Sequence, residues 1–241
     1  MFDNSTLLSS RQELEDIADL VRISFRLPLD GGFDLEDIVA HVRGGKTTKS
    51  RDFVDVVLTV TGFQIKSALD ATPITWKRIR IRHGIRLIQE SRCDASICQQ
   101  IGDSVIAASN THMADSFEKY GLDEIGYGRL ILDSYGTAVY FERLLCTRKS
   151  TLFAPADFRW EWAKRALHGV HRETGETWFR WNGDDSDNQL HFVGERRWWP
   201  SDDDPHCIRF GLPAAMSLEE FLERIPVKSG GNCQPACHTI P

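Results

Sequence analysis

Residues 53–67 read Phe-Val-Asp-Val-Val-Leu-Thr-Val-Thr-Gly-Phe-Gln-Ile-Lys-Ser, and this stretch decides the fold. Two apolar runs flank Thr61-Gly62, and their β-branched and aromatic residues favour strands, whereas the glycine favours a turn. We therefore predict a β-hairpin. A two-residue turn at Thr61-Gly62 would set Val60 opposite Phe63.

Three polar side chains interrupt these apolar runs. Because side chains alternate between the faces of a sheet, Asp55, Gln64 and Lys66 emerge on one face of the predicted hairpin. A carboxylate, an amide oxygen and an ammonium on adjacent strands can hold a divalent cation next to a phosphate. The pattern predicts a nuclease. The alternative is a solvated Asp–Lys ion pair at the edge of an ordinary sheet.

In these motifs the chain resembles the PD-(D/E)XK nuclease superfamily, which includes most type II restriction endonucleases. The resemblance covers about residues 10–145. Asp55 matches the first acidic position, and Gln64-Ile65-Lys66 matches the acidic-x-Lys tripeptide in the Gln-x-Lys form of some branches, such as the Mrr-like enzymes. The resemblance implies an α/β (α+β) fold with a restriction-endonuclease-like core, which is a mixed central β-sheet flanked by helices.

The resemblance also implies roles for the matched residues. Asp55 and the Gln64 carbonyl would bind Mg²⁺, and Lys66 would orient or activate the attacking water. Gln64 departs from the family pattern because it removes one negative charge from the metal site. A helix-borne acid, Glu13 or Glu36, would then supply the missing charge. Asp52 is the alternative to Asp55 for the first acidic position, although its side chain would leave the opposite face of the predicted strand.

Composition bounds the class of protein. With 241 residues, 41% of them hydrophobic, the chain can build one large or two small globular domains. No apolar run approaches the ~20 residues that span a bilayer. Met1 to Ser5 lack the features of a signal peptide, and six scattered cysteines form no disulfide framework. We therefore expect a cytoplasmic protein without a membrane partner.

The net charge of −6 is unevenly distributed. Between residues 40 and 100, eleven Lys and Arg stand against five Asp and Glu, which gives this segment a charge of +6 and the remainder −12. A basic region around the motif suits an enzyme that holds DNA in one cleft. The candidate DNA-binding residues that follow the motif are Lys77, Arg78, Arg80, Arg82 and Arg86.

Local signals predict the other elements of this part. Ser10 to Glu13 form a capping box that opens a helix over 11–25, and a short helix follows over 35–43 with Asp34 as N-cap. Residues 73–91 predict a basic helix, although the alternation around Arg80 also suits a strand. Further patterns predict a helix over 95–119 and strands over 128–133 and 137–145.

The C-terminal part differs in composition, because six of the seven tryptophans follow residue 150. Residues 178–181 and 189–192 predict paired strands in a Trp-rich β region. Its Trp and Arg side chains either stack on bases and bind phosphates or fill a small core. We divide the chain into a nuclease core over 1–149, a Trp/Arg-rich region over 150–228 for DNA recognition or dimerisation, and a flexible tail over 229–241.

Weaker motifs favour simpler interpretations. The loop over 44–50 lacks the spacing of a Walker motif, and the acidic turn over 183–188 lacks the ligand series of a calcium loop. Cys233, Cys237 and His238 form half a zinc site at most, so a disordered tail is favoured.

These observations predict a Mg²⁺-dependent endonuclease acting on double-stranded DNA, specifically a type II restriction enzyme. Cleavage of both strands of a palindromic site implies a homodimer. The restriction interpretation also implies a partner methyltransferase that protects host DNA. Two alternatives remain open: a repair, recombination or phage-defence nuclease of the same superfamily without a fixed site, and a non-catalytic DNA-binding protein on a decayed nuclease core.

Overall fold

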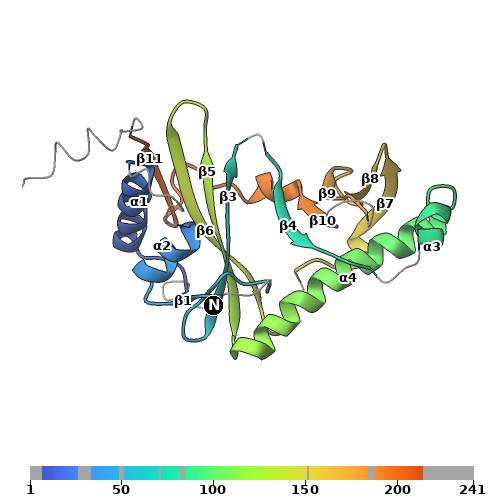
Figure 1. Ribbon diagram of the computed structural model, residues 1–241, viewed down its shortest axis with the longest axis horizontal. Helices are drawn as coiled ribbons and strands as arrows, with labels where there is room; N and C mark the ends of the chain where they lie inside the picture. The colour runs from blue at the N-terminus through green and yellow to red at the C-terminus, as the bar shows by residue number, and fades with distance from the viewer. Residues whose placement is uncertain are drawn as a thin grey trace, which may run out of the picture.

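The computed structural model describes residues 7–26, 34–48, 52–70, 72–81, 85–150, 152–183 and 188–213. These residues form a mixed α/β structure with two β-sheets (Figure 1). The helices are α1 (Arg11–Arg26), α2 (Leu35–Val42), α3 (Ile85–Glu90) and α4 (Ala95–Tyr120), with the 3-10 turns η1 (Pro155–Asp157) and η2 (Gly194–Trp198). In the described part of the chain, no helix has both the length and the apolar character needed to cross a bilayer.

The first sheet is mixed and has the order β1-β2-β3-β5-β6-β11. Its strands are β1 (Lys46–Thr47), β2 (Val56–Val57), β3 (Thr61–Leu69), β5 (Glu124–Leu132), β6 (Thr137–Thr147) and β11 (Cys207–Gly211). Among these described strands, only β3 and β5 pair in parallel. A parallel pair requires a crossover connection, and α4 lies in the connection between these two strands. The predicted α+β class is therefore confirmed.

The second sheet is antiparallel and has the order β4-β10-β9-β8-β7. Its strands are β4 (Ile74–Arg78), β7 (Phe158–Ala163), β8 (Ala166–His171), β9 (Thr177–Trp181) and β10 (Gln189–Phe192). The chain crosses between the sheets more than once, because β4 joins the C-terminal strands and β11 returns to the first sheet. The expected division at residue 149 therefore does not separate the two sheets.

The two faces of the first sheet pack differently. Phe63 and Ile65 of β3 contribute to a core cluster with the buried faces of α1 and α2. The opposite face belongs to a larger cluster that includes α4 and the second sheet, with Trp76 of β4 fully buried in it. Figure 1 shows α1 and α2 beside the first sheet and α4 running from α3 past the second sheet. Helices and the second sheet thus enclose β3 on both faces.

A buried ion pair links the C-terminal part to the first sheet. Arg129 of β5 donates from Nε to Glu195 Oε1 at 2.9 Å, and the Tyr127 hydroxyl donates to the same oxygen at 3.0 Å. Both charged side chains are almost inaccessible to solvent. Removal of either partner would leave a buried charge uncompensated, so this contact holds η2 against β5.

The hairpin exists, but its expected turn is wrong. Val56 pairs with Phe63, and Leu58 N donates to Thr61 O at 2.8 Å, so the turn lies at Thr59-Val60. The register moves by an even number of residues, and each side chain therefore keeps its predicted face. Gly62 lies inside β3, where an added Cβ would stand 2.7 Å from Leu122 Cδ1. Close packing, and not a turn, requires glycine there.

The other helix predictions have mixed outcomes. The helices over 11–25, 35–43 and 95–119 are confirmed within one residue at each end, and the capping box forms, with Ser10 N donating to Glu13 Oε2 at 2.7 Å. Asp34 is the N-cap residue of α2, but its side chain makes no capping bond. A single helix over 73–91 is wrong, because Ile74 and Trp76 alternate into the core as part of β4.

The strand predictions are confirmed for the pairs over 128–133 with 137–145 and 178–181 with 189–192. The tryptophans fill the core: Trp160 and Trp181 are buried, and Trp162, Trp178, Trp198 and Trp199 pack against the same cluster. The interpretation of these rings as base-stacking side chains is therefore not supported. Cys233, Cys237, His238 and the expected tail over 229–241 lie outside the described residues, as do positions 184–187 of the acidic turn.

Helix α4 approaches the second sheet closely at Gly102. An added Cβ would lie 2.0 Å from Cγ of Trp160 on β7. Gly→Ala in a helix interior ordinarily stabilises by about 1 kcal/mol. Here we expect Gly102→Ala to lower the free energy of unfolding by about 1–3 kcal/mol, because the core is overpacked. Urea denaturation measures this change. Gln100→Ala, at an exposed position of the same helix, is the control and should change stability little; a stabilised Gly102→Ala would contradict the packing.

Candidate active site

The candidate site begins at Asp55, directly before β2. The backbone carbonyl of Asp55 accepts from Thr48 N at 2.9 Å, which connects it to the β1 side of the sheet. Its side chain points the other way, and Oδ2 accepts from Ile65 N at 2.8 Å. The carboxylate thus bonds to a backbone donor of β3, and this contact holds the acid against the strand that carries the tripeptide.

Lys66 lies beside this carboxylate. Its Nζ is 3.2 Å from Asp55 Oδ2, and the two side chains keep 23% and 25% of their surfaces exposed. The pair is therefore neither sealed in the core nor fully solvated, and it remains accessible to a ligand. Asp55 is ahead of β2 and Lys66 is inside β3, so the structure brings together the acid and the lysine predicted from the motif.

Gln64 is almost fully buried, with 1% of its surface exposed. It lies two residues before Lys66, so both side chains leave the same face of β3. Its Nε2 donates to the backbone carbonyl of Trp76 at 3.1 Å, whereas its Oε1 accepts no hydrogen bond from a described residue. Only the amide nitrogen can donate to a carbonyl, so this bond fixes the orientation of the amide. An unsatisfied buried carbonyl costs about 1–3 kcal/mol unless a ligand or water binds it.

The structure distinguishes the two candidates for an additional acid. Glu36, in the first turn of α2, interacts electrostatically with both Asp55 and Lys66. Burial is the main cause that raises the pKa of the Glu36 carboxyl, and the nearby Asp55 charge raises it further. Glu13 instead caps α1 and lies 3.2 Å from Arg43 Nε. Glu36, and not Glu13, therefore belongs to the cluster around Asp55.

Lys77 of β4 is a second lysine near this cluster. Its Nζ donates to the backbone carbonyl of Asp52 at 2.7 Å. Burial lowers the pKa of Lys77, the Asp55 charge raises it and the Lys66 charge lowers it again, so all three groups lie within electrostatic reach. The sequence predicts DNA contact for Lys77 from a helix that follows the motif. In the sequence, the alternation of apolar and polar residues over Ile74, Thr75, Trp76 and Lys77 indicates that Lys77 lies on a strand.

Asp52 ties the cluster to the C-terminal end of α4. Its carboxylate lies 2.6 Å from Lys119 Nζ and accepts a short hydrogen bond from the Tyr120 hydroxyl. These contacts leave Asp52 in a structural position and not beside Lys66.

The pKa of His112 on α4 is lowered mainly by burial and then by the charge of Lys77. Nothing in the residue pattern singles out this histidine, and its coupling to Lys77 places it at the border of the cluster.

The remaining candidate DNA-binding residues do not share one element. Arg78 ends β4 with an exposed side chain, and the Arg80 side chain is exposed beyond it. Arg86 of α3 forms an ion pair with Glu90 at 2.8 Å. Arg82 lies outside the described residues. The sequence predicts one basic helix that contains all five residues. The structure instead has the strand β4 and the separate short helix α3 in this part of the chain.

The described residues contain no group of three or more His, Cys, Asp or Glu side chains arranged to hold a metal ion. The oxygen donors on the Lys66 face of β3 are instead the Asp55 carboxylate and the Gln64 amide oxygen, and the Glu36 carboxyl lies within electrostatic reach of Asp55 and Lys66. Mg²⁺ is commonly bound by one or two carboxylates, with substrate phosphate and water completing its shell. This donor set fits such a site, because it supplies one carboxylate and one buried oxygen that lacks a partner, with the Glu36 carboxyl within electrostatic reach.

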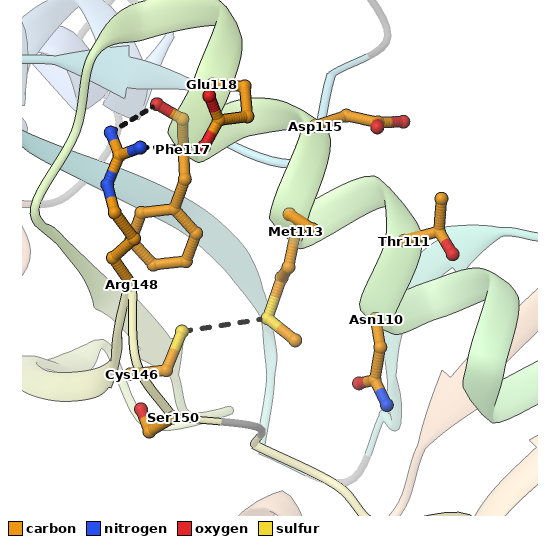
Figure 2. Close-up of a pocket in the computed structure, with 10 residues that line it drawn as sticks. Asn110, Thr111, Met113, Asp115, Phe117, Glu118, Cys146, Arg148 and Ser150 are labelled. Carbon is orange, nitrogen blue, oxygen red and sulfur yellow. Dashed lines mark hydrogen bonds and ion pairs between the residues drawn. The ribbon is translucent and has the colours of Figure 1, made fainter.

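A separate hollow of about 420 Å³ lies between α4 and the end of β6 (Figure 2). Its buried thiol, Cys146, contacts the Met113 sulfur at 3.8 Å, and burial raises the pKa of that thiol to about 12. The thiol is therefore protonated at neutral pH and unreactive. Arg148 donates to the Glu118 carboxylate and to the carbonyls of Phe117 and Leu122. The side chains lining this hollow offer no activated nucleophile.

Comparisons with protein-family models, with curated proteins and with solved structures gave no match.

The raised pKa of Glu36 predicts a pH dependence of stability. The folded state holds this proton more tightly than the unfolded state, whose carboxyl titrates near the ordinary value of 4.5. The contribution of Glu36 is therefore fully present below pH 4.5 and is lost as the pH rises through the folded-state pKa. Glu36→Gln should remove this loss, so the variant gains stability relative to wild type across that window. Urea denaturation at several pH values measures it, with Asp37→Asn on the same helix as control. Parallel profiles for wild type and Glu36→Gln would contradict the assignment.

Proposed function

We propose that the protein is a Mg²⁺-dependent endonuclease that hydrolyses phosphodiester bonds of double-stranded DNA. The observation that carries this proposal is the contact between the Asp55 carboxylate and the Lys66 ammonium across β2 and β3, with the unsatisfied Gln64 oxygen on the same face. An ordinary surface ion pair does not require a buried amide oxygen without a partner beside it. The combination supports a ligand site.

In this proposal Asp55, Gln64 and Glu36 hold the cation. A bound Mg²⁺ would polarise the scissile phosphate and make a nearby water more acidic. Glu36 is protonated more readily than an ordinary glutamate, and a cation would favour its charged form. The site therefore compensates for the neutral Gln64 with a carboxyl group from α2, which the β2–β3 hairpin alone does not provide.

Lys66 has the central role in the chemical step. Its ammonium can hold the attacking water or stabilise the negative charge that grows on the phosphate oxygens, because it is fixed by Asp55 before substrate binds. Lys77 adds a second positive charge near the same place. The two lysine charges offset the charges of one or two carboxylates, so the local electrostatic potential favours the binding of a phosphate anion.

The mixed sheet supports the resemblance to the PD-(D/E)XK superfamily. Helices α1 and α2 cover one face of the sheet, and α4 lies on the other side. Asp55 directly precedes β2, and Gln64 and Lys66 lie within β3. We propose a restriction-endonuclease-like core and, within the superfamily, a sequence-specific type II enzyme. Such an enzyme would act as a homodimer with one site per DNA strand, and a methyltransferase would protect the host DNA.

The second candidate function is a non-catalytic DNA-binding protein on a decayed nuclease core. The neutral Gln64 favours it, because the site has fewer negative charges than the family pattern. The Asp55–Lys66 contact argues against it, since a decayed site has no reason to keep this pair. A nuclease of the same superfamily without a fixed recognition sequence would share the chemistry described above.

Incubation of plasmid and genomic DNA with the protein, in Mg²⁺ or in EDTA, tests the proposal. We expect cleavage in Mg²⁺ only, into discrete bands for a site-specific enzyme and into a smear otherwise. Lys66→Ala should reduce the cleavage rate by on the order of 10²-fold or more while DNA binding persists. Lys46→Ala, at an exposed position of β1, is the control. A Lys66→Ala enzyme with wild-type activity would remove the catalytic role.

Substitutions at Gln64 test its role as a ligand. Gln64→Glu removes the hydrogen-bond donor to Trp76 O, so we expect a lower stability than wild type in the absence of divalent metal. The substitution also adds an anionic oxygen, so adding Mg²⁺ or Ca²⁺ should raise the Tm of the variant more than that of wild type. Cleavage should persist. Gln64→Leu should be folded but inactive. If Gln64→Leu cleaves DNA normally, residue 64 is only structural.

A further inference from the structure

The outer face of the second sheet carries a row of polar side chains across all five strands. Thr75 pairs with His191, His191 with Arg180, Arg180 with His168, and His168 with Glu161. The residues next to them in the strands are buried or partly buried, for example Phe179 and Trp181 beside Arg180 and Trp162 beside Glu161. The helices and η2 contact the opposite, apolar face, through contacts such as Trp160 with α4. This row, termed the outer row, therefore faces away from the core.

The charges of the outer row favour an anionic partner. Arg180 is exposed and forms no ion pair with a described residue, whereas Glu161 is paired with Arg159 at 2.6 Å. Three other arginines of the C-terminal part have partners: Arg159 with Glu161, Arg197 with Glu176, and Arg196 with the carbonyl of Asp70. Asp184, Asp185 and Asp187 of the β9–β10 connection lie outside the described residues. Arg165 and Arg172 are also exposed and form no ion pair with a described residue, but Arg180 is the arginine that belongs to the outer row.

The two histidines beside Arg180 are suited to hydrogen bonding. Burial, followed by the Arg180 charge, lowers the pKa of both His168 and His191, so the neutral rings dominate at pH 7. His191 also contacts the Asn182 amide at 3.3 Å. Arginine, histidine, asparagine and threonine are side chains that contact phosphates and base edges.

The outer row also connects to the candidate active site. Lys77 lies on β4, the edge strand of the second sheet that also carries Thr75, but a β-bulge separates the two positions, and Lys77 pairs with Leu190 whereas Thr75 pairs with His191. Lys77 reaches the Asp52 carbonyl and interacts electrostatically with Asp55.

We propose that this face binds the double-stranded DNA flanking the scissile phosphate, with Arg180 contacting the backbone and the two histidines contacting the backbone or base edges. The inference rests on the proposed nuclease function. It assigns DNA contact to the polar outer face of the second sheet and not to its tryptophans. A β-sheet that lies along a groove of the duplex is an established mode of DNA recognition.

The test is a salt titration of duplex DNA affinity in Ca²⁺, with wild type, Arg180→Ala, His168→Ala and Arg159→Ala. Log affinity falls linearly with log salt concentration, and removal of one phosphate contact should make this negative slope shallower by about 0.9. The loss of affinity between 50 and 200 mM salt should then be roughly threefold smaller than in wild type. We expect this change for Arg180→Ala and weaker binding for His168→Ala. Arg159→Ala is the matched control, because its charge is neutralised by Glu161 on the same sheet, and it should resemble wild type.

Several results would overturn the inference. Unchanged binding by Arg180→Ala, or equal effects of Arg180→Ala and Arg159→Ala, would mean that the face is solvated or acts only through its overall charge. Preference for double-stranded RNA over DNA of equal length would also contradict it. Cleavage of DNA in Mg²⁺ separates the two proposals: if wild type cleaves and Lys66→Ala does not, the nuclease function stands even where Arg180 proves irrelevant. If wild type neither binds nor cleaves DNA, both fail.

Discussion

The bond from Ile65 N to the Asp55 carboxylate is the contact on which the candidate site depends. The short strand β2 begins directly after Asp55, and the side chain takes a backbone donor of β3 at the point where regular pairing stops. This contact holds the acid next to Lys66 and places both on the side of β3 where Gln64 is buried. Backbone pairing, including the bond from Asp55 N to Phe63 O at 2.8 Å, joins the two segments, and the side-chain bond fixes where the carboxylate lies.

The residue pattern predicted this local geometry better than the overall topology. Alternation of side chains assigned Asp55, Gln64 and Lys66 to one face even though the turn was misplaced, because the error in register was an even number of residues. The helix α4 was predicted from the spacing of its apolar residues, and its observed bounds agree within one residue at each end. The assignment of β4 to the second sheet depends on pairing with β10, more than 100 residues later, and no local pattern encodes such a contact.

The electrostatic partners of the site also depend on tertiary structure. Glu13 and Glu36 both begin helices, and only the packing of α2 against β2 and β3 distinguishes them. Lys77 joins the cluster because β4 passes the face of β3, where its Trp76 carbonyl also accepts the Gln64 amide. The role of the C-terminal tryptophans also depends on tertiary structure. A tryptophan ring suits both a buried core and stacking on bases, and the order of the strands places these rings in the core.

The central claim is that Asp55, and not another acid of the same segment, organises a phosphodiester-cleaving site. Hydrolysis of duplex DNA in Mg²⁺ by Asp55→Asn and Asp52→Asn tests it most directly. Asp52 contacts Lys119 and Tyr120 of α4, so Asp52→Asn should lower stability but keep cleavage. Asp55→Asn should stay folded and lose cleavage. Wild-type cleavage by Asp55→Asn, or loss of cleavage only in Asp52→Asn, would contradict the account.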